Sequence, residues 1–129
     1  MNEYINHIIK KLDKSYPDID TELIYNSPFQ LLIATILSAQ CTDKIVNKTT
    51  INLFKQYPSI ENLAEAKTND VEKLIRSTGY YKLKARRIVN TSKKIIEKHN
   101  GIIPNNMQDL VELDGVGRKT ANIVLSIVF

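Results

Sequence analysis

The chain has 129 residues, of which 43% are hydrophobic, and it contains one cysteine, Cys41. This length suits one compact domain with a core, and a lone cysteine excludes an intrachain disulfide and cannot by itself hold a zinc ion or an iron–sulfur cluster. The formal net charge of +4 suits a polyanionic partner, although a solvated basic surface would give the same value.

No apolar run approaches the roughly 20 residues of a membrane span. The N-terminal stretch "MNEYINHIIKKLDKSY" is charged and amphipathic, unlike a signal peptide. We therefore expect a cytoplasmic protein without a membrane partner.

The hydrophobic pattern has a helical period along nearly the whole chain. A first helix, indicated by Ile5, Ile8, Ile9 and Leu12, ends before Pro17, because proline disfavours helix at the residue that precedes it. Ser27 and Pro28 then predict the N-cap and first turn of an apolar, central helix over "FQLLIATILSA". Thr42 or Asp43 can cap the next helix, which Pro58 closes.

The second half of the chain predicts two short helices, around "IENLAEA" and "NDVEKLIRST", and then a long basic helix over residues 82–100. Gly101 follows as its C′ glycine, and Pro104 starts the last unit, which includes a hairpin at 108–128. No alternating pattern of useful length indicates a strand. The chain is therefore predicted to be all-α.

The sequence contains an internal repeat. "LIRSTGYYKLKARRIV" (74–89) aligns with "LVELDGVGRKTANIVL" (110–125), so that Gly79 matches Gly115 and Ala85 matches Ala121. Both segments predict a helix, a tight glycine turn and a second helix. Two related hairpins are expected, each with free amides at a helix N-terminus.

The second hairpin has residues that suit a phosphate group. Its glycines permit a sharp turn and a close approach by another backbone, the following helix begins with unpaired amides, and Arg118 adds a charged contact. The alternative is a plain pair of caps between two core helices. Lys119 follows in the first turn, where the helix dipole and Arg118 both favour the neutral amine of a nucleophile. A second phosphate contact or a solvated lysine remains an equal alternative.

Several motifs together resemble the endonuclease III family. "LDGVGRKTANIVL" is similar to its helix–hairpin–helix signature, which usually has proline where this chain has Asp114. "SPFQLLIATILSAQCTDKIVNK", "STGYYKLKA" and "HNGIIP" resemble further family blocks in the same order. The resemblance implies a six-helix barrel over 23–129, preceded by an N-terminal helix and linker over 1–22 that pack with a C-terminal cluster lobe.

The resemblance also implies a function, base-excision repair by a DNA glycosylase and AP lyase that removes oxidised pyrimidines from duplex DNA. Lys119 lies at the position of the family's catalytic lysine, which forms a Schiff base and cuts the strand by β-elimination. Adenine-specific relatives without lyase activity have serine there. Such an enzyme is expected to be monomeric and associated with the nucleoid.

The resemblance assigns DNA contacts to other residues. Gln40 would fill the gap left by the flipped nucleotide, and Tyr80 would act as a wedge beside the opposite strand. A helix-terminal amide and a half-buried core tyrosine are the alternatives for these two residues. The hairpin contacts would come from Leu113, Gly115, Val116, Gly117, Arg118 and Thr120.

Two family elements do not appear in this sequence: a catalytic aspartate downstream of the lysine, and four cysteines that bind a [4Fe-4S] cluster. We therefore expect no cofactor or metal site in this chain, and a truncated protein of marginal stability that could associate through exposed apolar surface. The alternative function is a non-catalytic DNA-binding module or a decayed remnant.

Overall fold

A computed structural model describes residues 22–129, and all regular elements in this range are helical. The predicted all-α fold is confirmed for this part of the chain. The first predicted helix, with Ile5, Ile8, Ile9 and Leu12, and nearly all of the predicted unit 1–22 lie outside the described residues. The helices are α2 (Pro28–Leu37), α3 (Asp43–Gln56), α4 (Ile60–Ala64), α5 (Thr68–Ile75), η1 (Arg76–Thr78), α6 (Tyr81–His99), α7 (Met107–Val111) and α8 (Arg118–Val128).

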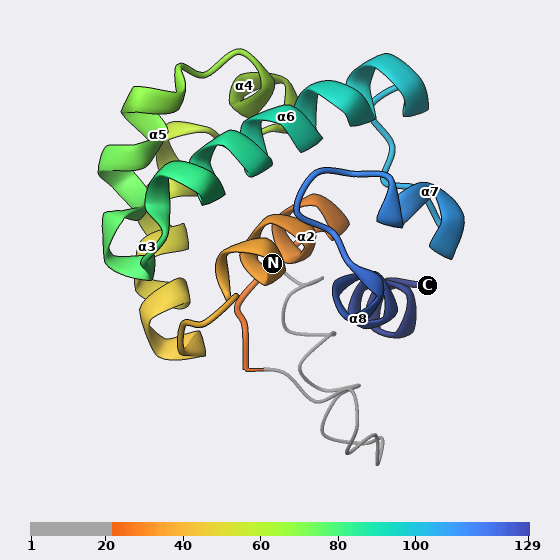
Figure 1. Cartoon of the computed structure of the whole chain (residues 1–129), viewed down its shortest axis with the longest axis horizontal. Coiled ribbons are helices and arrows are strands. Elements are labelled where there is room, and N and C mark those ends of the chain that lie inside the picture. Colours follow the sequence, from red (N-terminus) through yellow and green to blue (C-terminus); the bar gives the residue numbers. More distant parts are fainter. Residues whose placement is uncertain (1–21) are drawn as a thin grey trace.

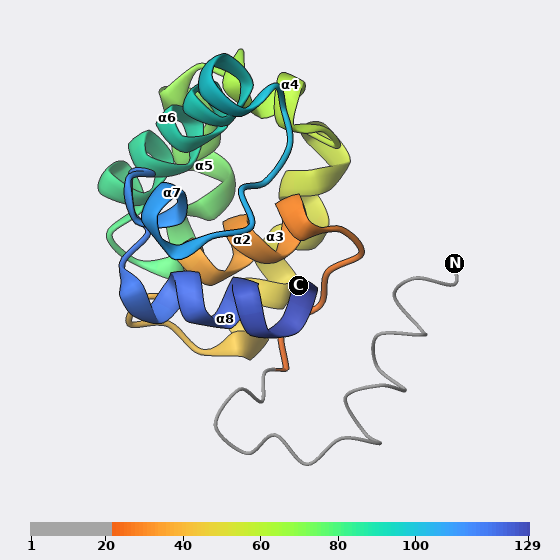
Figure 2. The same cartoon turned by 90° about the vertical axis from the view of Figure 1, so that its right-hand side faces the viewer.

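The apolar helix α2 is the centre of the fold. Eight of its ten residues are buried, and it packs against α3, α6 and α8. Figure 1 shows α3 to α6 on one side of α2 and α7 with α8 on the other. In Figure 2, α8 forms the layer below α2, opposite α4 and α6. The central position predicted from its composition is confirmed.

The helix boundaries follow the predicted caps. The Ser27 hydroxyl accepts a hydrogen bond from the Gln30 amide at the start of α2, and Thr42, rather than Asp43, caps α3 through the Ile45 amide. At the end of α6, Gly101 has a φ of +79° and donates its amide to the Ile95 carbonyl at 3.0 Å. This bond closes the helix as the C′ glycine predicted.

Candidate nucleic-acid interface

The second hairpin consists of α7, a turn over 112–117 and α8. The Leu113 and Val116 side chains are buried in the core, and the Val116 amide donates to the Leu113 carbonyl at 3.1 Å. Both side chains therefore fix the turn to the hydrophobic core. The contacts expected of these two residues can be made only through their backbone, and at Val116 the amide already has a partner.

The two glycines of the turn have different structural roles. Gly115 has a φ of +83°, and a Cβ there would lie 2.9 Å from the Cδ of Arg87. Only glycine fits both the conformation and the space. Gly117 has a φ of −93° and is the N-cap of α8, and a Cβ there would meet no atom within 4 Å. Its missing side chain instead leaves open space beside the first turn of α8.

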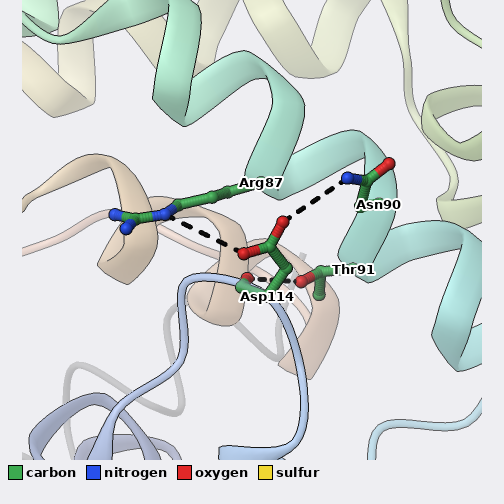
Figure 3. A network of polar contacts seen from close by, with 4 residues as sticks. All are labelled: Arg87, Asn90, Thr91 and Asp114. Carbon is green, nitrogen blue, oxygen red and sulfur yellow. Dashed lines mark hydrogen bonds and ion pairs between the residues drawn. The ribbon is translucent and has the colours of Figure 1, made fainter.

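Helix α6 holds the turn through polar side chains (Figure 3). The Thr91 hydroxyl donates to the Asp114 carbonyl at 2.6 Å, and the Asn90 amide donates to the Asp114 carboxylate at 3.4 Å. The Arg87 Nε lies 3.9 Å from the same carboxylate. One helical turn further along, Lys94 donates to the Glu112 carbonyl at 2.8 Å. These contacts hold the N-terminal arm of the turn, at Glu112 and Asp114, against α6.

The first turn of α8 is open to a ligand. Arg118 and Lys119 are exposed, and Thr120 is half-buried. Within residues 22–129, no side-chain cap accepts a hydrogen bond from the amides of the first turn of this helix. Free amides, the positive end of the helix dipole and two cationic side chains meet at one point, which is a suitable arrangement for a phosphate group.

Gln40 and Tyr80 are both exposed and both have left-handed backbone conformations, with φ values of 54° and 47°. Tyr80 is 65% exposed, which excludes the alternative of a half-buried core tyrosine. Gln40 lies three residues beyond the end of α2, and Tyr80 directly precedes α6. Such conformations are costly in residues other than glycine and are maintained by the surrounding structure.

The predicted basic helix over residues 82–100 includes Lys84, and the structure buries this lysine. The side chain is 1% exposed, and its ammonium donates to the Leu37 carbonyl at 2.8 Å and the Thr78 carbonyl at 2.7 Å. Burial lowers the pKa of Lys84, and the nearby Cys41 opposes this shift. Its spacing of four residues from the buried Ile88 is the sequence signal that indicates the core face of α6.

The candidate residues therefore form two groups that share one helix. The hairpin group, residues 113–120, follows a turn that Thr91 and Lys94 hold to α6 through the Asp114 and Glu112 carbonyls, with the Arg87 Nε 3.9 Å from the Asp114 carboxylate. The second group consists of Gln40 and Tyr80, called here the loop group. Each follows shortly after one of the two residues, Leu37 and Thr78, whose carbonyls Lys84 binds. Helix α6 supplies the contacts to both groups.

The residues present do not fit a [4Fe-4S] cluster. The sequence has only Cys41, which is half-buried, and no cluster of three or more His, Cys, Asp or Glu side chains occurs within 22–129. In the same range no helix is long and apolar enough to cross a membrane.

Comparison with known proteins identifies close sequence relatives. Residues 33–127 match the model of the family described as "HhH-GPD superfamily base excision DNA repair protein". Endonuclease III of Synechocystis sp. is 48% identical over 122 residues, which cover 95% of this chain and 56% of that protein. Endonuclease III of Bacillus subtilis is 41% identical over 125 residues, which cover 97% of this chain and 57% of that protein. The chain thus spans little more than half the length of these relatives.

Solved structures give the same result. One has a TM-score of 0.83 and 43% sequence identity to this chain, and it is described as "Structure of a Trapped Endonuclease III-DNA Covalent Intermediate: Estranged-Adenine Complex". The match covers 97% of this chain and 59% of that structure's chain. A thermostable thymine-DNA glycosylase, at 22% identity and a TM-score of 0.75, shares the fold over 98% of this chain and 58% of its own. The resemblance seen in the motifs is confirmed over nearly the whole chain.

Proposed function

Because this chain belongs to the HhH-GPD superfamily of base excision DNA repair proteins, we propose that it acts on duplex DNA as a glycosylase and AP lyase of the endonuclease III type. The proposed substrates are oxidised pyrimidines and abasic sites. The observation that carries the proposal is an exposed lysine, Lys119, in the uncapped first turn of α8. A covalent protein–DNA bond requires an accessible nucleophile at the place where the strand is held.

The proposed reaction begins at Lys119. Its neutral amine attacks C1′ of the flipped nucleotide, the C1′–N bond to the base breaks, and the base leaves with the bonding electron pair. The attacking nitrogen gives up one proton, which neutralises the departing base. Its lone pair then breaks the C1′–O4′ bond, O4′ takes up a proton from solvent, and the ring opens to a protonated Schiff base between Nζ and C1′. A proton then leaves C2′, the bond from C3′ to the phosphate oxygen breaks, and the strand is cut. At an existing abasic site the amine instead condenses with the aldehyde and releases water.

In this proposal the hairpin binds the DNA backbone. A phosphate would be bound by the free amides of α8 and by Arg118, with Gly117 leaving room for the strand to approach. Tyr80 presents an exposed ring that can stack on a base, and Gln40 presents an amide that can pair with an orphaned one. Extrusion of the target nucleotide is required because C1′ is not accessible within the stack.

Borohydride trapping tests the proposal. The 129-residue chain is incubated with a duplex that has one abasic site, and any Schiff base is reduced to a stable protein–DNA bond. We expect a covalent band with the wild-type chain and none with Lys119→Ala. The matched control is Lys93→Ala, which removes an exposed lysine from the middle of α6 for which no DNA contact is proposed. At saturating duplex, this control should give the wild-type yield.

The outcomes separate the two candidate functions. Loss of the band with Lys119→Ala alone supports the lyase. Salt-dependent duplex binding without any covalent band would instead support a non-catalytic DNA-binding module. We expect capture at abasic sites to be easier than release of an oxidised base, because condensation with an aldehyde needs only the amine.

A further inference from the structure

A buried lysine joins two segments that are far apart in the sequence. Lys84 is the largest fully buried side chain in the part of the chain that the structure describes, and its ammonium lies between the end of α2 and the end of η1. Burial of an ammonium group is unfavourable unless acceptors replace the lost water. Two carbonyl oxygens, at 2.8 and 2.7 Å, do so here.

Both acceptors are the last residues of helices. Leu37 ends α2 and Thr78 ends η1, and the carbonyls at such ends have no partner within their own helix and lie at the negative end of its dipole. A cation is favourable at this position. Lys84 therefore caps two helices with one group, across 47 residues in one case and six in the other.

Each capped end leads directly into an exposed residue with strained backbone. Gln40 lies three residues after Leu37, and Tyr80 lies two residues after Thr78. Both have left-handed φ values, which persist in non-glycine residues only where the surroundings hold them. The Lys84 ammonium binds a carbonyl oxygen of each segment and so joins the two directly.

We propose that Lys84 is a positioning residue that fixes Gln40 and Tyr80 relative to each other, so that both engage DNA as one unit. This inference rests on the proposed function, because it assumes that the two side chains contact a duplex. Lys84 itself touches neither the DNA nor the reacting atoms. Its effect is exerted through the two loops whose carbonyls it binds.

The test uses a duplex with a stable abasic analogue and 2-aminopurine opposite it, since the fluorescence of that base rises when it is unstacked. Lys84→Met keeps the length of the side chain and removes its donors. We expect this variant to bind the duplex about as tightly as wild type, within about threefold, because the hairpin provides the phosphate contacts. The fluorescence rise should be largely lost. The control is Ile95→Ala, a truncation of a fully buried residue on the same helix, which should keep the rise.

A mutant cycle separates positioning from general loss of stability. The rate of Schiff-base capture on abasic duplex is measured for Lys84→Met, for the double variant Gln40→Ala and Tyr80→Ala, and for all three changes together. Lys84→Met should slow capture about tenfold in the wild-type background and hardly at all in the double variant, since coupled residues are not additive. If Lys84→Met does not fold by circular dichroism, Lys84→Gln, which keeps an amide donor, takes its place.

The inference and the proposed function fail in different ways. Absence of capture and of duplex binding by the wild-type chain would overturn the proposed function. If the wild-type chain shows normal capture, two results would overturn the positioning role alone. One is that Lys84→Met slows capture equally in both backgrounds. The other is that Lys84→Met keeps the 2-aminopurine fluorescence rise, as Ile95→Ala is expected to do.

Discussion

At the residue scale, Gly115 and Gly117 show why the same residue type is needed twice in one turn. Gly115 has a left-handed φ and its α-carbon faces the Arg87 side chain, whereas Gly117 has an ordinary φ and faces open space. The first glycine is required by the fold. The second is required only if another molecule must approach the backbone at this point.

Alanine at each position should separate these requirements. Gly115→Ala should lower the free energy of unfolding by about 1–3 kcal/mol, because it adds backbone strain and a clash with Arg87. Gly117→Ala should change it by less than about 1 kcal/mol, since a weaker N-cap and a less flexible unfolded chain oppose each other. Urea denaturation measures both. Duplex affinity should fall for Gly117→Ala despite its unchanged stability, and an unchanged affinity would argue against phosphate binding at this turn.

The buried Lys84 predicts an unusual pH dependence. Burial lowers its pKa below the ordinary value of 10.5, so over a range of alkaline pH the unfolded chain holds a proton that the folded protein has released. Lys84 therefore makes the folded state more favourable as the pH rises through this range. The destabilisation caused by Lys84→Met should be larger near pH 10 than near pH 7, as measured by urea denaturation at each pH.

The control for this measurement is Ile95→Ala, whose effect should not depend on pH. Burial, followed by the charge of Asp70, raises the pKa of Tyr57, which acts in the opposite direction at alkaline pH. Because Tyr57 is present in every variant, its contribution cancels in the difference from wild type. A penalty for Lys84→Met that is constant from pH 7 to 10 would contradict the assignment.

Individual conformations were harder to predict than residue types. The glycines and Lys119 are visible in the sequence as a motif, but the burial of Lys84 depends on carbonyls of Leu37 and Thr78 that no local pattern reveals. The left-handed conformations of Gln40 and Tyr80 are likewise set by tertiary contacts, because local preference disfavours them. The helical spacing of Lys84 with Ile88 was the one available signal.

At the scale of elements, the helices were predictable because their boundaries are set by local chemistry. Hydrogen bonds to residues a few positions away mark these boundaries: Ser27 and Thr42 begin helices, and Gly101 ends one. What the sequence does not reveal is how α6 holds the hairpin. The bonds from Thr91 to Asp114 and from Lys94 to Glu112 join different elements, and they depend on the assembled fold.

Two neighbouring hydroxyl groups on α6 allow a test of how much the hydrogen bond from α6 to the hairpin turn contributes to stability and to Schiff-base capture. Thr91 and Ser92 are both fully buried, but Thr91 donates to the hairpin turn, whereas Ser92 donates to Ile88 within its own helix. Thr91→Val should cost about 1 kcal/mol of stability and slow Schiff-base capture, because the Asp114 carbonyl loses its donor. Ser92→Ala should affect stability to a similar degree and leave capture unchanged. Equal capture rates would show that the hairpin does not need this bond.

At the scale of the whole molecule, the formal net charge of +4 counts every lysine equally, whether or not its ammonium can reach a phosphate. Lys82 is exposed and Lys84 is buried, although they are two residues apart. Lys82→Ala should reduce the dependence of log affinity on log salt concentration by about 0.9, the value of one phosphate contact. Lys84→Met should leave the salt dependence unchanged. Duplex titrations between low and physiological salt concentration measure these slopes. Identical slopes for the two variants would contradict the prediction that only Lys82 contacts a phosphate.

The side chains that hold the two candidate groups, Lys84, Arg87, Thr91 and Lys94, follow one edge of α6 at intervals of three and four residues. An α-helix turns by about 100° for each residue. Insertion or deletion of a single residue between Lys84 and Lys94 would therefore rotate one set of contacts away from its partner while the other stayed in place. In this segment the exposed residues can vary in type, but the number of residues cannot change without separating the two candidate groups.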